Sequence, residues 1–297
     1  MQLLDYAAAL KLDSIQISSV GDYETTDPAH LEQVRKRAES LGLLIDAGTG
    51  CVCPTSSSYG PKEKDPVAYT LEGLRVAHAV GAKAMRCFLG SRPDRLGPLP
   101  IEAHMEAIVK VFRAVRQQAL DLDVKLALEN HNGDLEARDV RAILETAGKD
   151  FVGSCLDIGN PFWLAEDPLV TLETLAPYVV TTHVRDTAVY PHPRGCAFQW
   201  TALGDGSFDL KQFIARYAEL CPSAPMQLEI ITGRPPVVIP YLEPAFWKAF
   251  PGKSAAEVHK DFDALIRDLT AAAPALGLVL VCTSGAKGGG TMYALKA

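Results

Sequence analysis

Four ionisable side chains each follow a short run of apolar, strand-forming residues, and their types are those that bind metal ions. The segments are Lys125–Glu129, Val152–Asp157, Val179–His183 and Met226–Glu229, and each ends on the ionisable residue. Burying such a residue costs free energy unless it is paired or bound to a metal. If the segments are neighbouring parallel strands, their carboxyl ends ring one divalent cation. The alternative is four isolated polar groups at separate strand ends.

The predicted ligand set of Glu129, Asp157, His183 and Glu229 has three carboxylates and one imidazole. Such a set suits Mn²⁺, Mg²⁺, Co²⁺ or Zn²⁺ with about five or six ligands. A metal that chelates a carbonyl and a neighbouring hydroxyl stabilises the enediolate formed when the adjacent carbon loses a proton. Carboxylates on both faces would invert that carbon, whereas one carboxylate could shuttle a proton between carbons. The ligand set leaves epimerisation and isomerisation open.

Two further residues are expected to face the same side as the ligands. His131 lies two residues beyond Glu129, and Arg185 lies two beyond His183, so each shares a face with its neighbour on a continuing strand. His131 could bond a substrate hydroxyl or hold Glu129 in place. Arg185 could bind a substrate oxygen or phosphate, or form a surface salt bridge with Asp186.

Other candidate substrate-binding residues have a packing alternative. Trp163 could form an apolar wall of the pocket or pack in the interior, and Arg86 could reach the pocket or form a charge pair inside the sheet. The segments 187–208 and 232–253 are long and rich in Pro and aromatic residues. Long segments after the strands of a barrel build and cover its active site, so we expect a lid or a pocket wall there.

Strand-type and helix-type patterns alternate along the chain, which predicts a parallel α/β sheet. Strands are expected near residues 14, 43, 83, 125, 152, 179 and 226, and helices over 1–11, 27–41, 65–81, 101–121, 137–147, 168–176, 209–220 and 254–272. A (β/α)₈ TIM barrel needs about eight strands, so the first strand is missing or is replaced. Leu276–Cys282 is the candidate replacement, and Gly285–Gly290 reads as a flexible linker.

Composition excludes several classes of protein. The 297 residues are 48% hydrophobic and carry a net charge of −7, which suits one barrel domain over 1–297, with 274–297 as C-terminal strand and tail. The acidic balance argues against nucleic acid as the main partner. No apolar run approaches the roughly 20 residues that span a bilayer, and the N-terminus lacks signal-peptide features. Seven scattered cysteines favour reduced thiols in the cytoplasm.

Taken together, several segments resemble the sugar phosphate isomerase/epimerase family of the xylose isomerase-like TIM barrel superfamily. The matching pieces are Leu128–His131, Leu156–Asn160, His183–Asp186, Gly204–Gly206 and Leu228–Ile230, within a similarity that covers roughly residues 1–233. The resemblance implies a single divalent metal and a small sugar or polyol substrate in carbohydrate metabolism. Homo-oligomers are common among such barrels, and the aromatic segment 241–250 could form an interface.

The resemblance also assigns roles to individual residues. In ketose 3-epimerase-like members the residues corresponding to Glu129 and Glu229 exchange the substrate proton as well as binding the metal. Two positions depart from the family pattern, because Asn160 stands where relatives often have His and Gln16 where several have Glu. The first departure puts a proton-transfer or ligand role at Asn160 in doubt and leaves substrate binding as its expected role. The second could alter how substrate binds.

Three alternatives to a sugar isomerase or epimerase are considered. A dehydratase of the same superfamily, acting on an inosose or dehydroshikimate, would use the same metal but lose a β-hydroxyl. An endonuclease IV-like enzyme would need further His and Asp ligands, which the segments Gly48–Cys51 and Cys87–Gly90 do not supply. The last alternative is a degenerate, non-catalytic barrel that keeps a metal or sugar pocket. It would bind metal without turning over any polyol or ketose.

Overall fold

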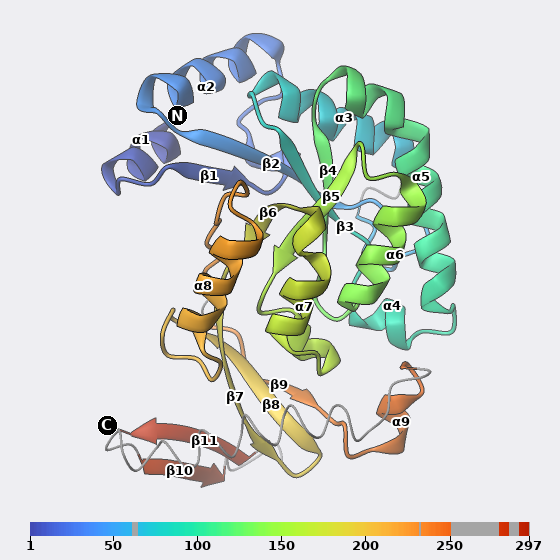
Figure 1. The fold of residues 1–297 in the computed structure, drawn as a ribbon, viewed down its shortest axis with the longest axis vertical. Coiled ribbons are helices and arrows are strands. Elements are labelled where there is room, and N and C mark those ends of the chain that lie inside the picture. Colours follow the sequence, from blue (N-terminus) through green and yellow to red (C-terminus); the bar gives the residue numbers. More distant parts are fainter. Residues whose placement is uncertain (61–64, 232, 251–278, 285–290, 297) are drawn as a thin grey trace.

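Six parallel strands in sequence order form a curled half-barrel (Figure 1). The computed structural model describes residues 1–60, 65–231, 233–250, 279–284 and 291–296. The strands are β1 (Ser14–Ile17), β2 (Leu44–Cys51), β3 (Ala84–Phe88), β4 (Lys125–Glu129), β5 (Val152–Asp157) and β6 (Val179–His183). Each pairs in parallel with the next, so their carboxyl ends meet at one edge. The predicted TIM-barrel-type fold is confirmed, in incomplete form.

Helices connect the strands and cover one face of the sheet. They are α1 (Gln2–Ala9), α2 (Pro28–Leu41), α3 (Pro66–Ala79), α4 (Arg92–Leu96), α5 (Ile101–Asp121), α6 (Ala137–Ala147), α7 (Pro168–Leu175), α8 (Leu210–Leu220) and α9 (Pro244–Trp247), with short 3₁₀ turns at Val20–Asp22, Pro161–Leu164 and Ala176–Tyr178. Local sequence explains their ends: the Asp65 side chain accepts a hydrogen bond from the Ala68 amide before α3, and Gly42, at φ 70°, ends α2.

The main hydrophobic core lies between the half-barrel and its helices. Leu74 of α3, Ile108 and Phe112 of α5, Leu126 of β4 and Ile143 of α6 are almost completely buried in one cluster. This packing fixes the strands and therefore the positions of the residues at their ends. Among the described residues, no helix combines the length and apolar character needed to cross a bilayer.

The seventh predicted strand is only partly formed. Segment 226–229 makes one parallel bridge, between Leu228 and Val184, with hydrogen bonds from the Val184 amide to the Gln227 carbonyl (2.8 Å) and from the Glu229 amide to the Val184 carbonyl (2.9 Å). Across the opening towards β1, the Ser14 hydroxyl bonds the Gln227 side chain at 3.2 Å. The barrel wall is therefore open between β1 and segment 226–229.

The C-terminal segment does not fill this opening. Within the candidate Leu276–Cys282, the described residues belong to β10 (Val279–Ser284), which pairs antiparallel with β11 (Thr291–Lys296) in a separate two-stranded sheet. The permuted-barrel alternative is therefore wrong, and the barrel of the described residues is incomplete. β10 and β11 form an antiparallel pair, so the backbone hydrogen bonds of β10 are made with β11 and not with the half-barrel. The predicted helix 254–272 and linker Gly285–Gly290 lie outside the described residues.

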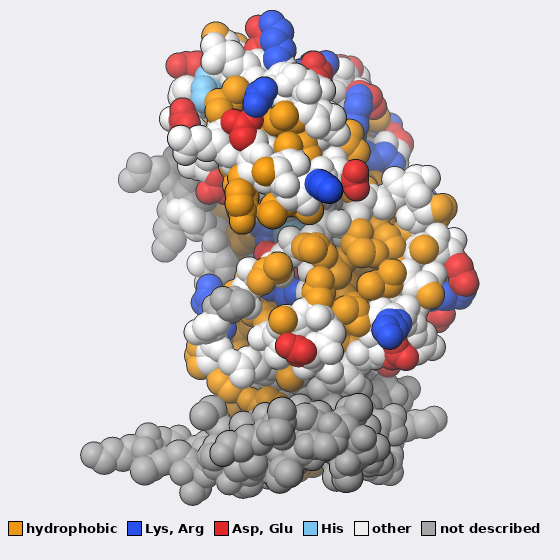
Figure 2. All heavy atoms as spheres, turned by 90° about the vertical axis from the view of Figure 1, so that its left-hand side faces the viewer, with side chains coloured by type: hydrophobic (Ala, Val, Ile, Leu, Met, Phe, Trp, Pro, Cys, Tyr) orange, Lys and Arg blue, Asp and Glu red, His pale blue; other side chains and the backbone are white. Residues whose placement is uncertain are grey.

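A groove of about 540 Å³ occupies the opening, between residues 11–18 and 225–229, and reaches His183. Leu228, which lines this groove, and Ile230, two residues later, are more than half exposed, at 52% and 69%. Figure 2 views the side of the molecule that carries α1, β1 and α8, and hydrophobic side chains gather on it. The opening thus leaves apolar surface uncovered that a closed barrel would bury.

An antiparallel sheet extends from the carboxyl end of the half-barrel. It consists of β7 (Asp186–His192), β8 (Gly195–Thr201) and β9 (Val237–Ile239). The segment 187–208, where a lid or pocket wall is expected, is mainly a hairpin, because β-prone residues flank the turn at Pro193 and Arg194, which Gly195 follows with a φ of 145°. Phe162, Phe198, Ile239 and Phe246 form a second core beneath it.

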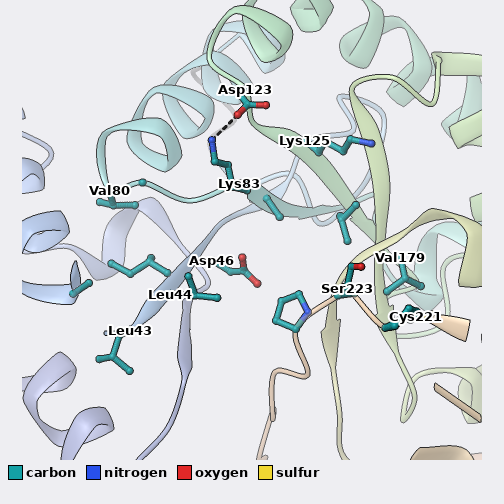
Figure 3. A pocket seen from close by; sticks show the side chains of 18 of the residues that line it. Leu43, Leu44, Asp46, Val80, Lys83, Asp123, Lys125, Val179, Cys221 and Ser223 are labelled. Atoms are coloured by element: carbon teal, nitrogen blue, oxygen red, sulfur yellow. Dashed lines mark hydrogen bonds and ion pairs between the residues drawn. The ribbon is translucent and has the colours of Figure 1, made fainter. Parts of the chain in front are cut away.

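Another cavity lies at the other end of the half-barrel, where the strands begin (Figure 3). It measures about 830 Å³ and is lined by residues such as Leu43, Lys83, Lys125 and Val179. Lys83 forms an ion pair with Asp123 on its rim. None of the four predicted ligands lines it, so this cavity is separate from the candidate metal centre.

Candidate metal centre

The four predicted ligands come together at the carboxyl edge of the sheet. Glu129, Asp157 and His183 are the last residues of β4, β5 and β6, and Glu229 follows the Leu228 bridge. One donor atom from each lies within 4.8 Å of the others. The parallel register explains this, since Glu129 pairs with Cys155 and Asp157 with His183. The expectation that these strand ends converge is met by the geometry.

The cluster fits a divalent cation by a test that is independent of any relative. His183 Nδ1 lies 3.4 Å from Glu129 Oε1, 3.5 Å from Glu229 Oε2 and 4.0 Å from Asp157 Oδ2. His183 Nδ1 is buried without a hydrogen-bond partner in the described part of the chain, and Glu229 Oε2, also buried, accepts no hydrogen bond and has an ion pair with Arg185. Buried polar atoms are rarely left unpaired, and a cation bound between them would satisfy both.

Gln16 orients the histidine, a role that the sequence did not suggest. Its Oε1 contacts His183 Nε2 and also accepts a hydrogen bond from the Ser18 hydroxyl at 3.1 Å. Because Gln16 Oε1 can only accept, Nε2 carries a proton, and Nδ1 is the nitrogen that faces the carboxylates and would bind a cation after losing its own proton. Burial would lower the pKa of His183, but Cys155 and Glu129 raise it well above its usual range.

Glu129 is completely buried and held by two side chains. Arg86 forms an ion pair with it, and Asn160 Nδ2 donates to Glu129 Oε1 at 3.1 Å. Burial alone would raise the pKa of Glu129, but Arg86 and His183 hold it well below its usual range, so the carboxylate is ionised. The guanidinium of Arg86 also donates to the Thr49 carbonyl at 3.3 Å. Arg86 is therefore an internal charge partner in this structure.

Asp157 is fixed by backbone groups and one arginine. Its Oδ1 accepts the amides of Gly159 (2.7 Å) and Asn160 (2.8 Å), and Arg185 forms an ion pair with it. The Asn130 side chain bonds the Asp157 backbone on both sides, at 2.8 and 3.0 Å. Burial raises the pKa of Asp157 to about 7 despite the opposing charge of Arg185. The sharp turn after β5 thus presents Oδ2 to the centre.

Arg185 is buried and spans two of the candidate ligands. It forms ion pairs with Asp157 and Glu229, and its guanidinium lies 4.3 Å from the centre of the Trp200 ring. These contacts hold its charge beside the cluster, where it offsets the excess of carboxylates. The stacking also joins the metal centre to β8 of the antiparallel sheet.

The salt bridge weighed between Arg185 and Asp186 is absent from the ion pairs of the described residues. The Asp186 carboxylate instead accepts the backbone amides of Gly204 (2.8 Å) and Gly206 (3.0 Å). A Cβ added at Gly206 would lie 1.7 Å from Asp186 Oδ1, which explains the need for glycine there. The Gly204–Gly206 turn therefore anchors the segment between β8 and α8.

A pocket of about 240 Å³ opens above the cluster. Its lining is His131, Asn132, Trp163, Arg185, Phe198, Gln199, Trp200, Glu229, Ile231, Arg234, Pro235 and Val237. His131 stacks on Phe88 with ring centroids 3.9 Å apart, and its Nδ1 bonds the Gly90 carbonyl at 2.7 Å. Burial lowers the pKa of His131, so its neutral ring leaves Nε2 as an acceptor.

The structure sorts the predicted substrate-binding residues into two groups. His131, Trp163 and Arg185 line the pocket, whereas Asn160 and Arg86 contact Glu129 and do not line it. The polar lining residues Asn132, Gln199 and Arg234, with Trp200, went unpredicted. In the sequence, the only indication that these residues line a pocket is that they lie in or near the long segments that follow strands. Side-chain contacts across the antiparallel sheet, which decide their positions, are not encoded by local patterns.

A second metal-type cluster overlaps the first. It combines Cys155 with Glu129 and His183, and all three are buried. Burial raises the pKa of the Cys155 thiol to about 11, so the thiol is protonated at neutral pH. Glu229 belongs only to the four-residue cluster and also lines the pocket. The four-residue cluster is therefore the one that a substrate can reach.

A half-barrel with metal-type ligands at the carboxyl ends of its strands defines a TIM-barrel-type protein with a candidate metal centre. The chain belongs to the xylose isomerase-like TIM barrel family, whose model matches residues 4–238. Among curated proteins, it is 26% identical over 210 residues to the 3-oxo-isoapionate decarboxylase of Pectobacterium atrosepticum, covering 70% of this chain and 68% of that protein.

Solved structures share the fold at low identity. A xylose isomerase domain protein from Planctomyces limnophilus matches with a TM-score of 0.62 and 19% identity, covering 90% of this chain and 92% of that one. A D-psicose 3-epimerase with D-tagatose from Clostridium cellulolyticum H10 matches with a TM-score of 0.62 and 15% identity, covering 91% and 90%. Other matches contain magnesium or zinc, and one is a probable 3-DHS dehydratase. At these identities the likeness establishes the fold alone.

Proposed function

We propose that this protein is a divalent-metal-dependent isomerase or epimerase that acts on a small sugar or sugar-like polyol. The observation that carries the proposal is one cluster, in which Glu129, Asp157, His183 and Glu229 converge beneath a pocket of about 240 Å³. This pocket is small enough to favour a ligand of monosaccharide size. Epimerases and a metal-containing neighbour of the same fold support this assignment.

Different residues would bind the metal, transfer protons, hold the substrate and exclude water. A divalent cation bound by the four ligands would supply Lewis acidity to a substrate carbonyl and its neighbouring hydroxyl. Glu229, which lines the pocket, removes the proton from the carbon beside that carbonyl. Glu129 is the second carboxylate: after taking up a proton it returns that proton to the other face of the carbon, and Glu229 then releases the proton it removed to solvent, while Arg185 and His131 hold substrate oxygens. Trp163 and Trp200 exclude water from the reacting carbon.

A second candidate function follows from the unequal access of the two glutamates. Glu129 is held by Arg86 and Asn160 and does not line the pocket, whereas Glu229 does. A single accessible carboxylate suits a lyase, which loses a β-hydroxyl or carbon dioxide and needs one proton-transfer group. The similarity to 3-oxo-isoapionate decarboxylase and to a probable 3-DHS dehydratase favours this as the alternative.

Solvent-deuterium exchange tests the proposal and separates it from the alternatives. Metal-loaded protein is incubated with ketoses in D₂O, and deuterium at the carbon beside the carbonyl is followed by NMR. We expect exchange in the wild type and a loss of about 10²-fold or more in both Glu229→Gln and Glu129→Gln. Retained exchange in both variants would contradict the assignment of these acid and base groups.

The matched control is Glu72→Gln, a change on the outer helix α3 that leaves the centre intact. A substrate that loses water or carbon dioxide, with Glu229→Gln inactive and Glu129→Gln active, would support the lyase instead. Metal binding without turnover of any ketose, polyol or 3-oxo acid would indicate a non-catalytic barrel.

A further inference from the structure

The pocket wall is richer in hydrogen-bond donors than the metal centre requires. Arg185 Nη1, Trp163 Nε1 and Trp200 Nε1 are buried nitrogens without a hydrogen-bond partner in the described ranges of the chain. All three belong to residues that line the pocket. An unpaired buried donor costs free energy, so oxygen atoms of a ligand are its expected partners. The wall therefore favours a ligand with many acceptor oxygens.

The pocket also carries an excess of positive charge. Its charged lining residues are Arg185, Glu229 and Arg234, and the first two form an ion pair with each other. Arg234 lies just before β9, its side chain is exposed, and no ion pair of the described residues includes it. Its backbone carbonyl accepts a hydrogen bond from Gln199 Nε2 at 3.0 Å, which fixes the segment at the mouth. Arg234 therefore presents a free cation to the pocket.

We propose that the ligand is a small polyhydroxy molecule with an anionic terminal group, carboxylate or phosphate, and that Arg234 binds this group. The inference rests on the proposed function, because the carbonyl end of the molecule then faces Glu229 and its acidic end faces the mouth. A guanidinium suits both anions, since its planar donors bind two oxygens at once. Arg234 thus determines specificity and takes no part in proton transfer.

Three ligands that differ only at the sixth carbon provide the test: D-fructose, D-fructuronate and D-fructose 6-phosphate. Dissociation constants are measured by calorimetry with metal-free and metal-loaded protein. We expect one or both anions to bind about tenfold or more tightly than D-fructose. Comparison of D-fructuronate with D-fructose 6-phosphate separates recognition of a carboxylate from recognition of a phosphate. Rising ionic strength should weaken the binding of the anions and leave the binding of D-fructose unchanged.

Variants of Arg234 provide the controls. Arg234→Ala should abolish the preference for the anion while changing the D-fructose constant little, and Arg234→Lys should restore part of it. Arg75→Ala, an exposed change on α3 outside the pocket, should behave as wild type. Equal affinities for all three ligands, no binding of either anion, or a preference that survives Arg234→Ala would overturn the inference. Deuterium exchange and metal content report separately on the proposed function.

Discussion

Glu129 and Glu229 have the same chemistry but unlike surroundings. The Glu129 side chain is fully buried between Arg86 and Asn160, whereas the Glu229 side chain is 27% exposed and lines the pocket. Burial of Glu129 is tolerated because a guanidinium compensates its charge. We therefore assign first contact with substrate to Glu229.

Replacing Arg86 should show that the buried Glu129 carboxylate depends on the charge of this arginine. In Arg86→Met, Glu129 loses its ion-pair partner and stays buried, so the metal-free protein should lose about 3 kcal/mol or more in its free energy of unfolding. Adding Mn²⁺ should recover part of the loss, because the cation supplies positive charge to the same carboxylate. Urea unfolding with and without metal measures both effects. A loss no larger than that of Arg75→Met would contradict the account.

Gln16 is predicted to act through His183 without touching the metal. Gln16→Ala should weaken metal affinity about 10- to 100-fold, because the imidazole loses the contact that orients it. Gln16→Glu keeps an acceptor oxygen and should retain the affinity. Competition titration with a metal chelator measures both, with exposed Gln117→Ala of α5 as control. Unchanged affinity in Gln16→Ala would show that Gln16 has no positioning role.

At the scale of elements, local sequence was sufficient for the half-barrel and insufficient for what covers it. Apolar runs and caps such as Asp65 predicted the longer described helices and the first six strands, though not the short α4 and α9, because the longer elements are stabilised by local pattern and burial. The ligands were predictable as strand-end residues. The hairpin β7–β8, the Gln16 contact and the pocket position of Arg234 depend on distant partners, which no local pattern encodes.

The turn at Gly204–Gly206 is the element-scale anchor that a single methyl group should break. Gly206→Ala places a Cβ 1.7 Å from Asp186 Oδ1, so the turn must move and the Asp186 hydrogen bonds weaken. We expect a loss of about 2 kcal/mol or more in the free energy of unfolding. The exposed control Gly21→Ala should change it by less than about 0.5 kcal/mol. Equal urea midpoints for both variants would contradict the anchoring role.

At the scale of the whole molecule, the half-barrel has one open side. β1 pairs only with β2 in the sheet, while β4 and β5 are paired on both sides. The groove beside β1 reaches His183 and Glu229, so the opening affects the metal centre as well as stability. An exposed strand edge with apolar neighbours is a site for pairing with another strand.

Hydrogen exchange should report this asymmetry directly. Amides of Ser14–Ile17 should exchange with solvent much faster than those of Lys125–Glu129 and Val152–Asp157, because the open edge permits local opening. Mass spectrometry of peptides from these strands measures the difference. Equal protection of β1 and β4 would mean that another strand covers the groove in solution.

Metal content shows directly whether the four predicted ligands hold a cation. The purified chain is analysed for Mn, Co, Mg and Zn beside the double variant Asp157→Ala/His183→Ala, with folding of both checked by circular dichroism. We expect about one divalent ion per wild-type chain and none in the folded double variant. No bound metal in the wild type after supplementation, or equal metal in both proteins, would contradict the four-ligand centre and the function built on it.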